Sequence, residues 1–148
     1  MSLQSWLESG WLKKHQATRK EIADLLALAD RDLKECLRAG LGADWQLSIA
    51  YNAALQAAAA ALVAEGFRTS GGTPHHHYTI QSLAYTIGAD ASRVRVFDEI
   101  RRKRNTAEYD RAGFISDAEA QQAVGFAARL RDDVVQWLRE KHPILLQK

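Results

Sequence analysis

The residues best suited to bind a ligand or take part in a reaction form a basic segment, RRKRNTAEYD, at positions 101–110. Four consecutive cations precede Asn105, and Glu108 and Tyr109 follow shortly after. A guanidinium group presents a planar fork of N–H donors that matches the oxygens of phosphate. The segment therefore predicts either a phosphate-binding site or the charged, solvated end of a helix.

Helical geometry separates one arginine of this segment from its neighbours. At the roughly 100° rotation per residue of an α-helix, Arg104 points almost the same way as Phe97, seven residues earlier. The inward stripe comprises Val94, Phe97, Ile100 and Ala107. Arg102 and Tyr109 point away from that stripe, and the outer cations Arg101, Arg102 and Lys103 are expected to form a solvated face.

An arginine that faces the interior is costly unless it has a partner. Glu108 is four residues after Arg104 and lies beside it on a helix, so the two could pair and tie the bundle end together. Alternatively, Arg104 stands in a crevice between helices, or between two protomers, where it meets a phosphate. The helix wheel alone does not choose between these interpretations.

A second candidate element is the run His75-His76-His77. Adjacent histidines on a helix cannot converge on one metal ion, and no cysteine or carboxylate lies nearby in sequence, so no metal site is expected. The run is interpreted as the polar start of a helix with Tyr78 packed inward. Alternatively, one histidine, with His76 and His77 as candidates, lines the same crevice as Arg104 and supplies a base.

The bulk properties restrict the classes of function. The 148 residues are the usual size of one domain, and we expect a single unit over 1–148. With 20 basic and 18 acidic residues, the net charge is only +2. This charge is too small for nucleic acid to be bound electrostatically by the surface as a whole. The absence of phosphate-loop and dinucleotide motifs predicts no cofactor, and without a leader or spanning segment we expect a cytoplasmic protein.

Capping signals place the first two long helices. Thr18 and Glu21 have capping-box spacing at the start of a helix that the glycines at 40 and 42 end. Asp44 is expected to cap a second helix over 45–65, which is apolar nearly all round and is therefore either central or covered on a second side by a partner chain. The single Cys36 excludes an internal disulfide, and its place on an apolar stripe with Leu37 predicts a buried, inert thiol.

The remaining segments complete the expected organisation. A flexible loop covers 68–74, a shorter helix runs from 75 to Gly88, and Asp90 caps a helix that enters the basic segment. A turn at 111–115 precedes a second capping box, Ser116 with Glu119, which opens the last helix. Residues 1–17, with Trp6 and Trp11, are expected to dock on the core.

These elements predict an all-α fold, an antiparallel up-and-down bundle of four to five helices. Over roughly 44–140 the chain resembles the HEPN domain family, on the strength of three segments: AYNAALQAAAAALVAEGF, HHHYTIQSL and RKRNTAEYD. The resemblance implies a HEPN-like bundle, often homodimeric. Catalytic members are metal-independent ribonucleases with an Arg, a polar residue such as Asn, and a His a few residues on. Several are toxins paired with a nucleotidyltransferase antitoxin.

Arg104 and Asn105 match the start of that motif, and Tyr109 stands where the family has its histidine. Tyrosine titrates near pH 10 and is a poor general base at neutral pH. The preferred hypothesis is therefore a non-catalytic, HEPN-like module that binds RNA or nucleotide phosphate through Arg104, Asn105 and the outer cations. One alternative is a ribonuclease that uses Arg104 with Tyr109 or a histidine from 75–77. The other is a structural bundle held by an Arg104–Glu108 pair.

Overall fold

The computed structural model describes residues 1–72, 75–109 and 115–147, with side chains for all of these except 106–109. Within this part of the chain there are six α-helices: α1 (Leu3–Glu8), α2 (Arg19–Glu35), α3 (Ala43–Ala64), α4 (His75–Gln81), α5 (Ala91–Tyr109) and α6 (Asp117–Lys141). Two short 3-10 helices are η1 (Ser82–Ala84) and η2 (Pro143–Leu146). Two strands, β1 (Leu12–Lys14) and β2 (Phe67–Thr69), complete the fold.

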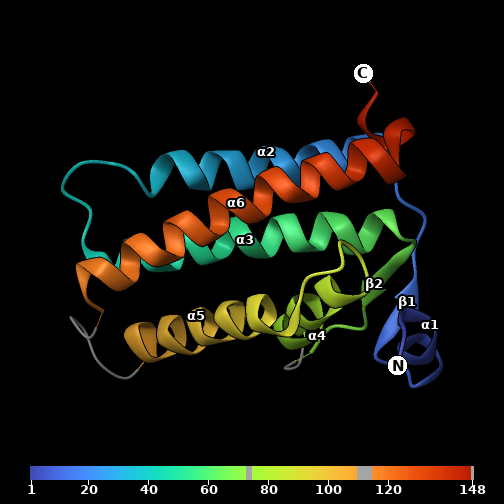
Figure 1. The fold of residues 1–148 in the computed structure, drawn as a ribbon, viewed down its shortest axis with the longest axis horizontal. Helices are drawn as coiled ribbons and strands as arrows, with labels where there is room; N and C mark the ends of the chain where they lie inside the picture. Colours follow the sequence, from blue (N-terminus) through green and yellow to red (C-terminus); the bar gives the residue numbers. More distant parts are fainter. Residues whose placement is uncertain (73–74, 110–114, 148) are drawn as a thin grey trace.

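The long helices α2, α3, α5 and α6 lie lengthwise, and each runs opposite to the one before it in the chain (Figure 1). The shorter elements α1, α4 and the two strands gather toward one end. The molecule is thus mostly helical, as the sequence predicts, with the helices packed together around one main core.

The alanine-rich helix α3 is the centre of the molecule, which confirms the prediction from its apolarity. It packs against α2, α5 and α6, and Ala57, Ala58 and Ala61 have no exposed surface. Small side chains let the neighbouring helices approach closely on several sides. By length and composition α3 is apolar enough to cross a membrane. However, 67% of its most apolar 18-residue stretch is buried inside the protein.

The caps agree with the predictions in part. Ser116 and Glu119 form the complete capping box of α6. Thr18 Oγ1 accepts from the Glu21 backbone N–H, whereas the Glu21 carboxylate contacts His15 Nε2 at 2.7 Å instead of returning to the helix start. The prediction for Asp44 is wrong. Gly42 is the N-cap of α3, and the Asp44 carboxylate instead accepts from the Ile115 backbone N–H at 3.3 Å.

Later boundaries are also close to those predicted. Asp90 Oδ1 accepts from the Arg93 backbone N–H at 2.8 Å and caps α5. Gly66 and Gly88 adopt positive φ values of 94° and 75° where the preceding helical segments end. The segment from His75 is a shorter α-helix than expected and continues as the 3-10 helix η1. The predicted turn at 111–115 lies, except for Ile115, outside the described residues.

The two strands correct the all-α prediction. β1 and β2 pair antiparallel with Leu12 opposite Thr69, Lys13 opposite Arg68 and Lys14 opposite Phe67. The first two residues of the expected loop at 68–74, Arg68 and Thr69, are therefore strand. Each strand has three residues, too few for an alternating pattern to stand out. Pairing between segments this far apart in sequence leaves no local signal.

The N-terminal segment docks, as predicted. Trp6 is 5% exposed, and its ring packs in edge contacts with Trp11, Tyr78 and Tyr85. Leu37, by contrast, is not on the buried stripe of α2: it is 65% exposed because the helix ends at Glu35. Cys36 is buried and free, as expected, and burial raises the pKa of its thiol.

Candidate functional site

Arg104 faces the interior of the bundle, as the helix wheel predicts. Its guanidinium carbon is 5.5 Å from the centroid of the Tyr51 ring on α3, and Nη1 donates to Asn105 Oδ1 at 3.4 Å. The stripe that orients it is buried: Phe97 is fully inaccessible, and Val94 and Ile100 are nearly so. A cation over an aromatic face is attracted by the negative potential of the ring.

Tyr51 also contacts one of the three adjacent histidines. Its hydroxyl oxygen is 2.9 Å from His76 Nδ1, and the two ring centroids are 5.7 Å apart. The Tyr51 side chain is 1% exposed, so α3 holds it rigidly between α4 and α5. The structure therefore brings His76 and Arg104, 28 positions apart in the sequence, around a single buried ring.

The electrostatics of this cluster favour a neutral histidine. Burial is the largest cause that lowers the pKa of His76, and the positive charges of His75, Arg104 and Arg101 lower it further. Burial likewise raises the pKa of Tyr51 well above its usual range, so the phenol stays protonated. At neutral pH the cluster thus contains a neutral imidazole hydrogen-bonded to a neutral phenol, beside a permanent guanidinium cation.

The other cations of the basic segment are not all solvated, which corrects the prediction. Asp98, about one turn earlier on α5, pairs with Arg101 at 2.9 Å and with Arg102 at 3.0 Å. Lys103 reaches Glu119 of α6 at 3.2 Å. The side chains of Arg101 and Lys103 are only 25% and 31% exposed, whereas that of Arg102 is 72% exposed. Only Arg102 is therefore a largely solvated cation.

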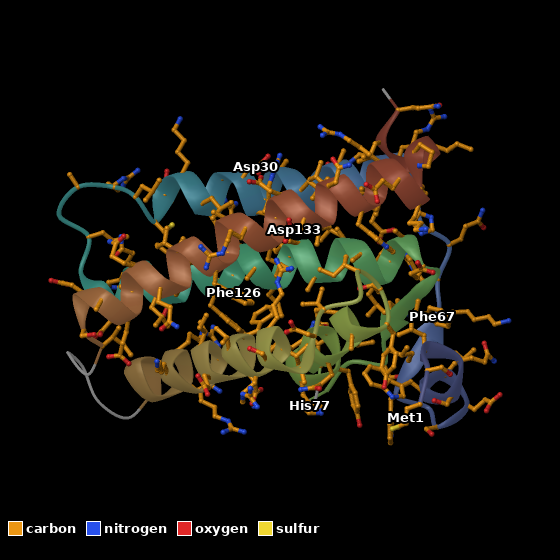
Figure 2. All side chains as sticks on the ribbon, in the orientation of Figure 1. Met1, Asp30, Phe67, His77, Phe126 and Asp133 are labelled. Atoms are coloured by element: carbon orange, nitrogen blue, oxygen red, sulfur yellow. The ribbon has the colours of Figure 1, made fainter. Side chains whose placement is uncertain are left out.

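The three histidines have three different partners. His75 Nδ1 contacts the Thr69 hydroxyl, His76 contacts Tyr51, and His77 lies at the lower edge of the molecule (Figure 2), where it meets the Tyr78 ring at 5.2 Å. Tyr78 is partly buried in the N-terminal apolar cluster, as predicted. The described residues include no group of three or more His, Cys, Asp or Glu side chains that could hold a metal ion.

Two candidate residues of the basic segment cannot be placed in the cluster. The side chains of Glu108 and Tyr109 lie outside the described residues, so the Arg104–Glu108 pair and the motif position of Tyr109 stay predictions. The sequence interpretation missed Tyr51 and Asp98. Asp98 has a local signal, since it precedes Arg101 and Arg102 by three and four residues. Tyr51 has only a weak local signal, a hydroxyl group on an otherwise apolar face of the helix.

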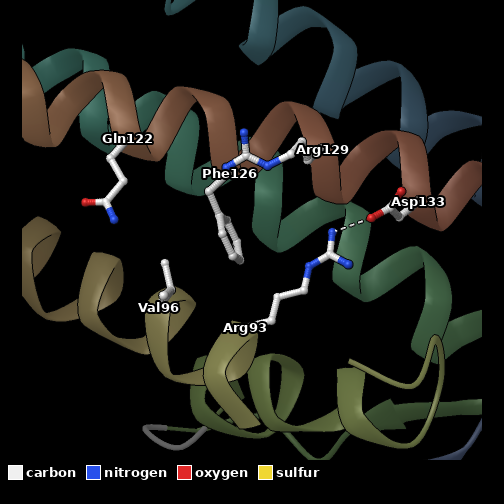
Figure 3. Close-up of a pocket in the computed structure, with 6 residues that line it drawn as sticks. All are labelled: Arg93, Val96, Gln122, Phe126, Arg129 and Asp133. Carbon is white, nitrogen blue, oxygen red and sulfur yellow. Dashed lines mark ion pairs between the residues drawn. The ribbon is translucent and has the colours of Figure 1, made fainter. Parts of the chain in front are cut away.

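A separate groove lies between α5 and α6 (Figure 3). Its volume is about 410 Å³, and it is lined by Arg93, Val96, Gln122, Phe126, Arg129 and Asp133. An ion pair of 2.7 Å between Arg93 and Asp133 crosses it. The Phe126 ring is 5.2 Å from Phe97, which in turn lies 5.8 Å from Tyr51. Phe97 therefore links this groove to the Tyr51 ring over which Arg104 lies.

Comparison with known proteins gives no match to any family model, curated protein or solved structure. The HEPN resemblance stays a prediction that rests on the segments quoted above.

Proposed function

We propose that the protein is a HEPN-like, non-catalytic module that binds RNA or a nucleotide phosphate at the Arg104 cluster, defined as Tyr51, His76, Arg101 and Arg104. One observation carries the proposal: Arg104 and His76, from different helices, meet at the same buried ring. Arg101 adds positive charge at the same place, since it too lowers the pKa of His76. Asn105 contributes an amide beside the guanidinium.

A bound phosphate is the ligand that suits this arrangement. Arginine offers paired N–H donors to phosphate oxygens, and the gain is larger where water is partly excluded. Asp98 offsets part of the charge of Arg101, so Arg104 is the principal phosphate contact. The same proposal includes the homodimer and the nucleotidyltransferase-type partner that the resemblance implies. It also includes a role in a toxin–antitoxin or related defence system, and a cytoplasmic location.

Binding of a fluorescent single-stranded RNA at low salt tests this function. Arg104→Ala should weaken binding about tenfold or more, because a charged hydrogen-bonding group at phosphate is lost. Arg102→Ala is the matched control. It removes the same charge from a solvated position on the same helix and should weaken binding only slightly. Equal affinities of Arg104→Ala and the wild type would overturn the proposal.

A second function, metal-independent RNA cleavage, is favoured by the position of His76. The lowered pKa leaves its imidazole neutral at pH 7, the form that a general base requires. In this mechanism Arg104 steadies the scissile phosphate, and His76 takes the proton of the 2′-hydroxyl in place of the histidine that Tyr109 replaces.

The two functions differ in a chelator-resistant cleavage assay. If the protein is a ribonuclease, His76→Gln should abolish cleavage and retain RNA binding, and His77→Gln should cleave normally. If the protein only binds, no chelator-resistant cleavage accompanies binding. Cleavage that persists in both Arg104→Ala and His76→Gln would exclude this site as its source.

A further inference from the structure

We propose that single-stranded RNA held at the Arg104 cluster continues across α4 onto the β1–β2 hairpin, where phosphates contact Lys13 and Arg68 and a base stacks on the aromatic group beside them. This inference rests on the function proposed above and extends it to the class of ligand, a single strand several nucleotides long. Lys13 and Arg68 on the outer face of the two strands, together with Trp11 just before β1, are called the hairpin face below.

The hairpin face carries an unusual pair of charges. Lys13 and Arg68 are directly opposite each other in the β1–β2 register. Their neighbours Leu12 and Thr69 are buried, so Lys13 and Arg68 project outward, and both are exposed. Like charges at directly opposed positions destabilise a strand pair. Among the described residues neither cation forms an ion pair with a carboxylate, and a phosphate between them would relieve the repulsion.

A pair of stacked aromatic side chains, Trp11 and Tyr78, lies at the start of β1. Trp11 comes directly before β1, two residues before Lys13, and packs against the cluster that contains Leu12. Its ring is stacked on Tyr78, with centroids 5.1 Å apart and an interplanar angle of 18°, and the exposed His77 meets the edge of Tyr78. Trp11 and Tyr78 are only partly buried. Aromatic side chains next to cations are the usual means of holding single-stranded nucleic acid without sequence preference.

The helix α4 joins this surface to the Arg104 cluster. Its consecutive residues His76, His77 and Tyr78 turn from Tyr51 on one side to Trp11 on the other. α4 contacts both α5 and β2, and its His76 reaches the Tyr51 ring over which Arg104 lies. In Figure 2, His77 lies on the lower edge of the molecule and Phe67 marks the hairpin beyond it. In this proposal, an RNA strand that leaves Arg104 crosses α4 to the hairpin face.

The test compares two probes, a fluorescent oligouridylate of about 12 nucleotides and the dinucleotide UpU as a competitor. The double variant Lys13→Ala/Arg68→Ala should bind the oligomer about tenfold more weakly. The slope of log K for binding against log salt concentration should become less steep by about 1.4, the value for two lost phosphate contacts. Binding of UpU should be unchanged, because it occupies only the Arg104 cluster. Trp11→Phe should retain binding and lose part of the tryptophan fluorescence quenching that RNA causes.

The matched control is Arg139→Ala/Lys141→Ala, which removes two exposed cations from the end of α6 and should leave both affinities unchanged. If Lys13→Ala/Arg68→Ala binds the oligomer like the wild type while Arg104→Ala does not, the hairpin face is excluded and the Arg104 site stands. If the hairpin variant loses binding and Arg104→Ala does not, the proposed function fails and the hairpin face stands alone. If the wild type binds neither probe, both proposals fail.

Discussion

At the scale of single residues, Tyr51 is the side chain that contacts candidate site residues from two different helices. Its ring lies under Arg104 of α5, and its hydroxyl reaches His76 of α4. Because Tyr51 is buried and belongs to the central helix, it fixes the positions of both partners relative to the core. Substitutions of Arg104 or His76 are therefore expected to alter both stability and binding. The size of each effect distinguishes a structural role from a binding role.

The titration of His76 should make stability depend on pH. Burial, helped by neighbouring cations, lowers the pKa of His76 in the folded protein. The unfolded chain binds this proton below about pH 6.5, whereas the folded protein binds it only at lower pH. The contribution of neutral His76 to the free energy of unfolding is therefore complete above about pH 6.5. It is lost as the solution is acidified toward the pKa of His76 in the folded protein. We expect His76→Gln to flatten the fall in the free energy of unfolding between about pH 7 and pH 5, measured by urea titration.

His77→Gln is the control for that measurement, because His77 is an exposed neighbour on the same helix. It should show the same pH dependence as the wild type. A wild-type slope in His76→Gln would mean that other groups cause the acid sensitivity.

The stability of Arg104→Ala separates a binding arginine from a structural one. Loss of its contact with the Tyr51 ring should cost about 1 kcal/mol. If the arginine were instead one half of an essential buried ion pair with Glu108, the cost would rise to about 3–5 kcal/mol. Urea unfolding measures the difference, and Arg102→Ala, a surface change, should stay within about 0.5 kcal/mol of the wild type.

At the scale of elements, caps and helix-end contacts hold α5 and α6 at the basic segment. α6 begins with the Ser116–Glu119 capping box, and the Glu119 carboxylate also reaches Lys103 of α5. The backbone N–H of Ser116 and the Lys103 ammonium, which donate to that carboxylate, lower the pKa of Glu119. One residue thus satisfies a helix start and links it to the neighbouring helix.

Removing the cap should weaken the protein measurably. Ser116→Ala leaves the backbone N–H of Glu119 without its side-chain acceptor, and we expect a loss of about 1 kcal/mol in the free energy of unfolding. Ser92→Ala is the control, since Ser92 is exposed near the start of α5 and forms no side-chain hydrogen bond among the described residues. It should change stability by less than about 0.5 kcal/mol. Equal effects of the two changes would contradict a capping role.

At the scale of the whole molecule, α3 organises the packing. α2 and α6 pack closely against it, and α4 and α5 bring His76 and Arg104 to its Tyr51. The run of alanines is what permits this approach, because larger side chains would push the neighbours outward. The geometry of the candidate site thus depends on the size of side chains elsewhere on the same helix.

Enlarging one of these alanines should therefore destabilise the protein. Ala57 has no exposed surface, and Ala57→Leu should cost about 1–3 kcal/mol through overpacking. Ala27→Leu makes the same change on the exposed side of α2 and should be nearly neutral. Thermal and urea unfolding measure both. A neutral Ala57→Leu would mean that α3 is less closely packed than its burial indicates.

Much of the fold follows from local signals in the sequence. The capping box at Ser116, the cap at Asp90 and the glycines at 66 and 88 mark helix ends, because such signals act within one turn. The inward direction of Arg104 follows equally from its spacing to Phe97, since helix geometry is regular. Helical class, central helix and the orientation of one arginine were therefore predictable.

The remaining features depend on contacts between distant segments, and only the tertiary structure decides them. Pairing of 12–14 with 67–69 makes the hairpin, and no property of either segment predicts it. The meeting of His76, Tyr51 and Arg104 depends on how α4 and α5 pack on α3. Lys103 is drawn from the solvated face by Glu119 of another helix. Helix periodicity tells which way a side chain points, whereas its partner is set by the packing of the elements around it.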